Sequence, residues 1–261
     1  MENIMQKAPI NQTFVHEENC EIFDPLGDGI SSIELVRVSG SDLDVANAAR
    51  VSYGKISTQL TDKDRSLINF LMEHEHTSPF EHNQLSFRVK MPIFVARQWM
   101  RHRMHSYNEV SYRYTKVKTE FFVPQEWRFQ DTVNHQSSIG AFENEELRTC
   151  YEASIKVAWD TYNKLLDAGV CRELARAVLP VATYTEIIFT TNLHALMHFM
   201  RLRLSSGAQR EIRAYARAMF KLAFKHFPVS LLAWQKKYVQ SIDKELDDEL
   251  NAWIDMLGDV K

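Results

Sequence analysis

The sequence predicts an α+β fold in which a small, mostly antiparallel sheet packs with long helices, and three observations support this. Residues 84–90 alternate between apolar and polar side chains, as expected of a strand with one buried face. β-branched and aromatic residues dominate 183–191, which predicts a second strand. Residues 143–168 and 208–227 are long stretches without proline or glycine, and both predict helices.

The N-terminal part of the domain supplies further elements. Residues 33–38 predict a strand, and the alanine-rich residues 42–53 predict a helix. Thr61 and Asp64 resemble a capping box with Asp where Glu is preferred, so a helix should begin after Thr61. The apolar side of that helix has three residues: Leu67, Phe70 and Leu71.

The middle of the chain is less regular. Residues 124–142 are polar and irregular, which predicts a variable loop. Gly169 should cap the helix 143–168, and Pro180 should end a short helix over 171–179.

Composition limits the class of protein. The 261 residues suit a polar N-terminal extension, residues 1–31, followed by a single domain, residues 32–261. The net charge of −3 argues against a general nucleic-acid or membrane binder, and no apolar run is long enough to span a bilayer. Cys20, Cys150 and Cys171 fit neither a disulfide framework nor a zinc pattern, and no signal peptide is evident, so we expect a cytoplasmic protein.

The most informative stretch is 101–113, which contains three Arg and two His. In a slightly acidic protein such a local cationic cluster usually faces an anion. Pro92 suits the first turn of a helix, and helical periodicity continues from Ile93 to His105. On this helix Arg103 points away from Arg101, and one arc holds Gln98, Arg101, His102 and His105.

An extended segment should follow. Alternation places Glu109, Ser111 and Arg113 on one side of it, where an acceptor, a hydroxyl and a guanidinium would suit a phosphorylated, hydrogen-bonding ligand. The alternative is a solvated, arginine-rich helix followed by an edge strand.

Residues 74–82 contain three His and two Glu, which suggests a metal site. Their spacing matches no standard zinc pattern, and His is common around a proline turn. We therefore favour a site without metal.

The predicted helix 192–204 begins at Asn192, a suitable N-cap. One face holds His194, His198 and Arg201, whereas Arg203 falls on the apolar face. Burying an unpaired charge is costly. Arg203 should therefore meet a carboxylate or an anionic ligand, or reach water from the helix end.

Several blocks resemble the flavin-dependent thymidylate synthases. Arg-His-Arg at 101–103 is followed, after seven residues, by Ser111, as in the family signature. Pro-Phe-Glu-His at 79–82 and Pro-Ile-Phe-Val-Ala-Arg-Gln-Trp at 92–99 match flanking blocks of the family. The likeness extends from about residue 33 to about residue 228.

The resemblance implies the family's fold and its reaction, the reductive methylation of dUMP to dTMP. In that reaction 5,10-methylenetetrahydrofolate donates the methylene group, and FAD reduced by NADPH provides the hydride. The chain lacks the Pro-Cys-His setting of conventional thymidylate synthases, so no protein nucleophile is expected. The resemblance also implies a homotetramer whose sites are shared between subunits.

Site residues follow from the matching blocks. Arg203 is expected to be catalytic, because it aligns with the Arg that polarises the uracil ring and favours loss of the N3 proton. The residues expected to bind dUMP are Gln98, Arg101, Glu109, Ser111, Arg113, Arg176 and Arg203. The residues expected to bind FAD are His82, Arg101, His102, Arg103, Glu109, Asn192, His194 and His198. No metal is expected.

The sequence departs from the family at Ser205 and Gly207, where many members have Asp and His. Two alternatives stay open. An RNA-binding module would combine the cationic stretch with stacking on tyrosines 107, 112 and 114. A family member that binds FAD without turnover is the other alternative.

Overall fold

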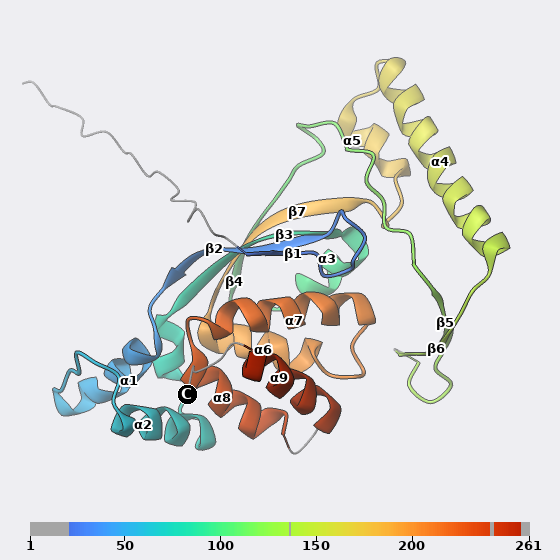
Figure 1. Ribbon diagram of the computed structural model, residues 1–261. Helices are drawn as coiled ribbons and strands as arrows, with labels where there is room; N and C mark the ends of the chain where they lie inside the picture. The colour runs from blue at the N-terminus through green and yellow to red at the C-terminus, as the bar shows by residue number, and fades with distance from the viewer. Residues whose placement is uncertain (1–20, 136, 241–242, 257–261) are drawn as a thin grey trace, which may run out of the picture.

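The computed structural model describes residues 21–135, 137–240 and 243–256. A five-stranded sheet crosses this part of the chain, and every neighbouring pair of strands is antiparallel (Figure 1). The α+β prediction is confirmed. In sheet order the strands are β1 (Ile22–Phe23), β2 (Ser32–Ser39), β3 (Gln84–Pro92), β7 (Tyr184–Asn192) and β4 (His105–Glu109).

The central strand β3 separates an apolar face of the sheet from a polar one. Leu85, Phe87 and Val89 are all 0% exposed, as the alternation predicts. On the other face Arg88 lies 3.6 Å from both Glu34 and Glu186 on the neighbouring strands. The apolar face therefore forms the core with the helices.

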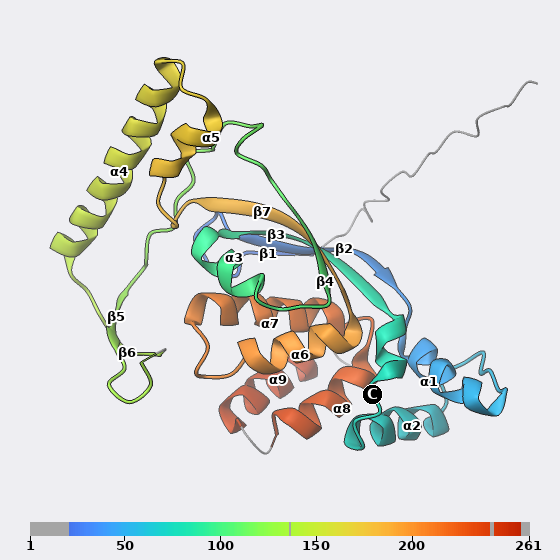
Figure 2. The same ribbon diagram turned by 180° about the vertical axis from the view of Figure 1, so that it is seen from behind.

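Four helices lie beneath that apolar face (Figures 1 and 2). They are α6 (Leu193–Arg203), α7 (Arg210–Phe224), α8 (Pro228–Tyr238) and α9 (Lys244–Met256). Trp99 connects the two layers, because its ring centroid lies 5.5 Å from Phe189 of the sheet, 4.8 Å from Phe199 of α6 and 5.9 Å from Tyr215 of α7.

Shorter helices flank this core. Their bounds are α1 (Asp42–Arg50), η1 (Val51–Tyr53), α2 (Asp62–Glu73), η2 (Ser78–His82) and α3 (Ile93–Trp99). The capping box at the start of α2 is confirmed, since the Thr61 side chain accepts from the Asp64 N–H and the Asp64 carboxylate accepts from the Thr61 N–H. Asn192 is likewise confirmed as the N-cap of α6, where it accepts from the Ala195 N–H at 2.7 Å.

A separate arm extends away from the core (Figures 1 and 2). It contains α4 (Glu145–Asp167), α5 (Arg172–Ala175) and η3 (Arg176–Val178). Along α4 the buried residues are Ile155 and Tyr162, while Leu147 and Val157 are exposed. Much of this helix is therefore uncovered within one chain.

Residues 124–142 are not the irregular loop that the sequence predicts. They contain the antiparallel hairpin of β5 (Trp127–Gln130) and β6 (Ser138–Phe142). The stacked rings of Phe129 and Phe142, 4.3 Å apart, supply a local cross-strand contact that outweighs the polar composition. At the other end of the chain, residues 1–20 of the predicted extension lie outside the described residues.

The predicted helix from Ile93 to His105 is also wrong, because α3 ends at Trp99. His105 instead begins β4, which pairs with β7 along its whole length. A longer helix would leave the backbone groups at that edge of β7 without partners. Strand pairing therefore overrides the helical periodicity of this stretch.

The extended segment predicted over 109–114 is likewise wrong. Glu109 is the last residue of β4, and Ser111 begins a turn in which its carbonyl accepts from the Tyr114 N–H at 2.9 Å. The Tyr112 hydroxyl donates to the Tyr184 carbonyl at 2.6 Å and holds this turn against the sheet. Glu109, Ser111 and Arg113 therefore do not share one strand face.

We expect Gly40→Ala to destabilise the fold by about 2 kcal/mol or more. Gly40 has φ +98°, and a Cβ there would lie 1.8 Å from Oδ1 of the fully buried Asn83. Urea unfolding measures the loss. Gly54→Ala is the matched control, since Gly54 also has positive φ but nothing within 4 Å of its Cβ. Equal losses in both variants would show that the clash with Asn83 has no cost.

Candidate functional site

The turn after α3 determines where the cationic side chains point. His102 N–H donates to the Trp99 carbonyl at 3.0 Å, and Met104 adopts a left-handed conformation with φ +64°, which is uncommon for a residue with a side chain. This turn leaves Arg101 and Arg103 exposed and buries His102, which is 7% exposed. The three residues of the motif therefore differ in environment.

His102 contacts Arg203, a residue 101 positions further along the chain. The Arg203 Nε–H donates to His102 Nε2 at 2.8 Å, and its Nη2 donates to the Gln98 carbonyl at 3.3 Å. Arg203 is the last residue of α6, so these bonds join α6 to the turn after α3. The structure thus brings together three of the predicted site residues: Gln98, His102 and Arg203.

Arg203 lies near a cluster of histidine side chains, and no described carboxylate pairs with it. Burial, and then the nearby Arg203 cation, lower the pKa of His102 to about 4, so its ring is neutral at physiological pH. Burial likewise lowers the pKa of His105 to about 4 and depresses the pKa of His198. Among the described residues no carboxylate forms an ion pair with Arg203. Its charge is therefore not neutralised locally.

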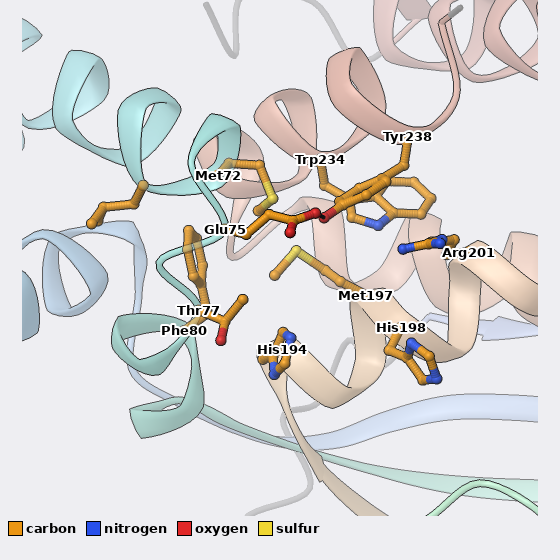
Figure 3. Close-up of a pocket in the computed structure, with 11 residues that line it drawn as sticks. Met72, Glu75, Thr77, Phe80, His194, Met197, His198, Arg201, Trp234 and Tyr238 are labelled. Carbon is orange, nitrogen blue, oxygen red and sulfur yellow. Dashed lines mark hydrogen bonds between the residues drawn. The ribbon is translucent and has the colours of Figure 1, made fainter. Parts of the chain in front are cut away.

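A small pocket lies beside this cluster, between α2, η2, α6 and α8. Figure 3 shows Arg201 of α6 pointing toward Tyr238 of α8, with His194 and His198 further along the same helix. The Arg201 guanidinium lies 4.9 Å from the centre of the Tyr238 ring. The cavity volume is about 50 Å³, whereas sites that enclose a cofactor usually measure roughly 300 Å³ or more. The pocket is too small to enclose a flavin ring by itself.

Other predicted residues gather where α6 begins. His194 Nδ1 lies 3.4 Å from the Glu81 carboxylate, so η2 meets the first turn of α6. His82 ends η2 and is exposed, and Asn192 sits directly before α6 as its cap. The site residues from α6 and η2 thus form one continuous region.

The remaining predicted residues lie toward the arm. The Glu109 carboxylate accepts from the Thr185 hydroxyl at 2.6 Å. Arg113 stacks on Tyr114, with 5.3 Å from its guanidinium carbon to the ring centre. Arg172 of α5 donates to the Tyr114 carbonyl at 3.0 Å, which brings α5, η3 and the exposed Arg176 to this end of β4. The candidate residues thus fall into two groups, one at α3 and α6 and one at the arm (Figure 2).

The sequence did not reveal several residues of these groups. Trp234 and Tyr238 line the pocket, and neither is among the predicted site residues. Their i, i+4 spacing on a helix that begins with Pro228 is the signal that could have identified them. Gln209, whose side chain accepts from that of Gln98, follows the turn after α6 and had no sequence signal.

Buried His102 and half-buried His105 predict how stability depends on pH. Above pH 6.5 the folded and unfolded states are both neutral at these positions, and below it the unfolded chain takes up protons first. We expect the free energy of unfolding to fall by about 3 kcal/mol from pH 6.5 to 4.5 through these two groups, after discounting for partial solvation. Urea unfolding over this range measures the slope.

His105→Gln should make the free energy of unfolding less dependent on pH, because about one fewer proton is taken up on unfolding. His135→Gln, at an exposed position between β5 and β6, is the control and should leave the slope unchanged. An identical slope in parent and His105→Gln would contradict the lowered pKa of His105 in the folded state.

Within the described ranges, no helix is long and apolar enough to cross a bilayer. The same ranges contain no group of three or more His, Cys, Asp or Glu side chains arranged to hold a metal ion.

Comparison with known proteins gives a consistent result. Residues 34–229 match the family described as "Thymidylate synthase complementing protein". The chain is 44% identical over 208 residues to a flavin-dependent thymidylate synthase of Thermus thermophilus, covering 80% of this chain and 77% of the relative. It is 45% identical over 196 residues to that of Thermosipho melanesiensis, covering 73% and 84%.

A solved structure is also similar. It is the UMP/dUMP methylase PolB from Streptomyces cacaoi, bound with 5-Br dUMP. The TM-score is 0.73 at 39% sequence identity, and the match covers 79% of this chain and 95% of that chain.

Proposed function

Since this chain belongs to the flavin-dependent thymidylate synthase family, we propose that it catalyses the reductive methylation of dUMP to dTMP. The methylene donor is 5,10-methylenetetrahydrofolate, and NADPH reduces the bound FAD. No protein nucleophile takes part. Similarity to a dUMP methylase in both fold and sequence supports the substrate.

The observation that carries this proposal is the environment of Arg203. Its guanidinium is partly buried and bonded to two neutral acceptors, the His102 ring and the Gln98 carbonyl. Buried charges in proteins are normally paired. A cation held in this way, with no carboxylate beside it among the described ion pairs, is suited to an anionic ligand or to a ring that becomes negative during reaction.

The residues present fit FAD. Its two phosphates need cations that no carboxylate has already neutralised. Arg101 and Arg103 are exposed and take part in none of the ion pairs between described residues. When bound, FAD supplies the hydride that completes the methyl group. We propose that it is held by His82, Arg101, His102, Arg103, Glu109, Asn192, His194 and His198.

The nucleotide needs both acceptors and cations. We propose that dUMP is bound by Gln98, Arg101, Glu109, Ser111, Arg113, Arg176 and Arg203. Arg113 and Arg176 are exposed guanidiniums suited to the phosphate, because arginine binds phosphate oxygens with two parallel N–H groups. Ser111 binds rather than attacks, since none of the hydrogen bonds of the described chain joins its hydroxyl to a histidine.

Arg203 acts on the pyrimidine ring. A guanidinium beside the ring stabilises the anion formed when the N3 proton leaves, and it does so more strongly where water is excluded. The ring then gains electron density at C5, the carbon that receives the methylene group. The role of Arg203 is therefore electrostatic, and it requires the guanidinium to be held in one orientation.

The two groups of site residues also support a homotetramer with sites shared between subunits. The arm group and the α6 group lie on different parts of one chain, and much of the surface of α4 is not covered by other residues of that chain. A second chain placed against the arm would complete the site. We further propose a cytoplasmic location, in keeping with Cys150 and Cys171, which are exposed free thiols.

A visible spectrum and a turnover assay test the function. The purified protein should be yellow or take up added FAD, and NADPH oxidation should depend on dUMP and yield dTMP. A colourless protein with salt-sensitive RNA affinity would favour the RNA-binding alternative instead. Bound FAD without any dTMP would indicate a family member that has lost turnover.

A further inference from the structure

We propose that His102 is a positioning residue, whose unprotonated ring nitrogen fixes the direction of the Arg203 guanidinium. This inference rests on the proposed function, because it concerns how the catalytic Arg203 is oriented. This role is additional to the part of His102 in the proposed flavin site. It predicts that, with FAD saturating, the effect of His102 on kcat passes through Arg203.

The geometry assigns the roles of donor and acceptor. Arginine nitrogens only donate, so the 2.8 Å bond from Arg203 Nε makes His102 Nε2 the acceptor. The ring proton is therefore on Nδ1. The second anchor runs from Arg203 Nη2 to the carbonyl of Gln98, a residue of α3. None of the hydrogen bonds between described residues uses the remaining terminal N–H groups of Arg203, which can therefore meet a ligand.

The imidazole is itself held in place. Its ring centre lies 4.7 Å from that of Phe199 on α6, and the residue is 7% exposed. The Tyr107 hydroxyl lies within hydrogen-bond distance of the carbonyls of His102 and Trp99, at 3.2 and 3.3 Å. The acceptor is therefore fixed by packing before any ligand binds, as a positioning group must be.

A neutral anchor has a chemical advantage here. Two other partly buried arginines of the described chain are held by carboxylates: Arg50 by Asp64 at 2.6 Å and Arg128 by Glu211 at 2.7 Å. A carboxylate would also orient Arg203, but it would neutralise the charge that the reaction needs. An imidazole orients the guanidinium and leaves its full positive charge for the pyrimidine.

A double-mutant cycle tests the inference. His102→Leu removes the acceptor, and we expect kcat to fall roughly 100-fold because Arg203 loses its orientation. All variants are assayed at saturating FAD, so that any weaker flavin binding does not contribute to the loss of kcat. In the Arg203→Ala background, His102→Leu should cost about twofold or less, because its partner is already absent.

His102→Gln provides a rescue variant that keeps a neutral acceptor. Its kcat should recover to within about tenfold of the parent. If the glutamine variant is as slow as the leucine variant, although both melt at the parental temperature, the acceptor role is wrong. Should His102→Leu fail to fold, His102→Gln decides the matter alone: a folded glutamine variant more than about tenfold slower than the parent would contradict the acceptor role.

His105→Gln is the matched control. His105 is also a histidine with lowered pKa, but its Nδ1 lies 2.8 Å from the Thr191 hydroxyl rather than against Arg203. Any loss it causes should add to the loss from Arg203→Ala. Additive losses for His102→Leu as well, measured at saturating FAD, would overturn the inference and leave His102 as a flavin ligand alone.

The double-mutant cycle can test the role of His102 even if the proposed function is wrong. If the parent protein forms no dTMP but binds dUMP in a calorimeter, the catalytic proposal fails and the cycle is repeated on dUMP affinity. The same non-additivity between positions 102 and 203 is then expected. Additive effects on dUMP affinity would overturn the inference without bearing on turnover. If the parent protein does not bind dUMP, both the proposed function and the inference are wrong.

Discussion

Replacing Arg203 with alanine should lower kcat for dTMP formation by roughly 100- to 1,000-fold. The loss is expected to be this large because Arg203 is the one proposed site cation that is partly buried and bonded to neutral groups. In such surroundings a fixed charge stabilises a developing anion far better than it would in water. FAD should stay bound, because the proposed flavin ligands lie mainly on the turn after α3 and at the start of α6.

Single-turnover formation of dTMP, together with a flavin spectrum of the same sample, measures both parts of this prediction. Arg217→Ala is the matched control, since that guanidinium pairs with Glu249 on α9 and is not among the proposed site residues. It should retain parental activity. An Arg203→Ala enzyme that turns over at the parental rate would rule out the electrostatic role.

The elements that sequence predicted well are those controlled by local rules. Alternation identified β3 because its pattern of period two depends only on which face is buried, and Leu85 and Phe87 are fully buried. Thr61 and Asn192 were identified as caps because a cap bonds to a backbone group within three residues. Such signals need no knowledge of the rest of the fold.

The errors occur where a distant partner decides the structure. Residues 100–105 have the composition of a helix, but β7, some 80 residues later in the chain, offers an unpaired edge that β4 occupies. The helical wheel drawn through this stretch placed Gln98, Arg101, His102 and His105 on one arc. In the structure the turn buries His102 and exposes Arg101, so the arc does not exist.

The candidate site was predictable as a set of residues but not as a set of contacts. The family resemblance identified His102 and Arg203 as site residues. No spacing rule could show that two residues 101 positions apart share a hydrogen bond. A carboxylate partner for Arg203 was one of three alternatives left open by the sequence. The structure shows two neutral acceptors, an arrangement that the sequence alone did not suggest.

The division of the site into two groups leads to the second large effect, which is recovery of activity on mixing inactive variants. Arg203 lies at the end of α6 and Arg176 on the arm, and the arm extends away from the helical core (Figure 1). If one dUMP needs both side chains, we expect two different subunits to supply them. A chain without Arg203 and a chain without Arg176 can then form an intact site together.

We therefore expect Arg203→Ala and Arg176→Ala, each nearly inactive at low dUMP, to regain about a quarter of parental activity when co-expressed and purified as a mixed oligomer. This value follows from random assembly, in which about one site in four receives both arginines. Two affinity tags select the mixed species, and dTMP formation at low dUMP measures the recovery.

The matched control mixes Arg203→Ala with His102→Leu. These two positions are in direct contact within one chain, so every site contains a cluster damaged at one position or the other, and no recovery is expected. Recovery in the first mixture alone locates the arm arginine and the catalytic arginine of a site on different subunits. Absence of recovery in both mixtures would place Arg176 and Arg203 of each site on the same chain, and the uncovered face of α4 would then need another explanation.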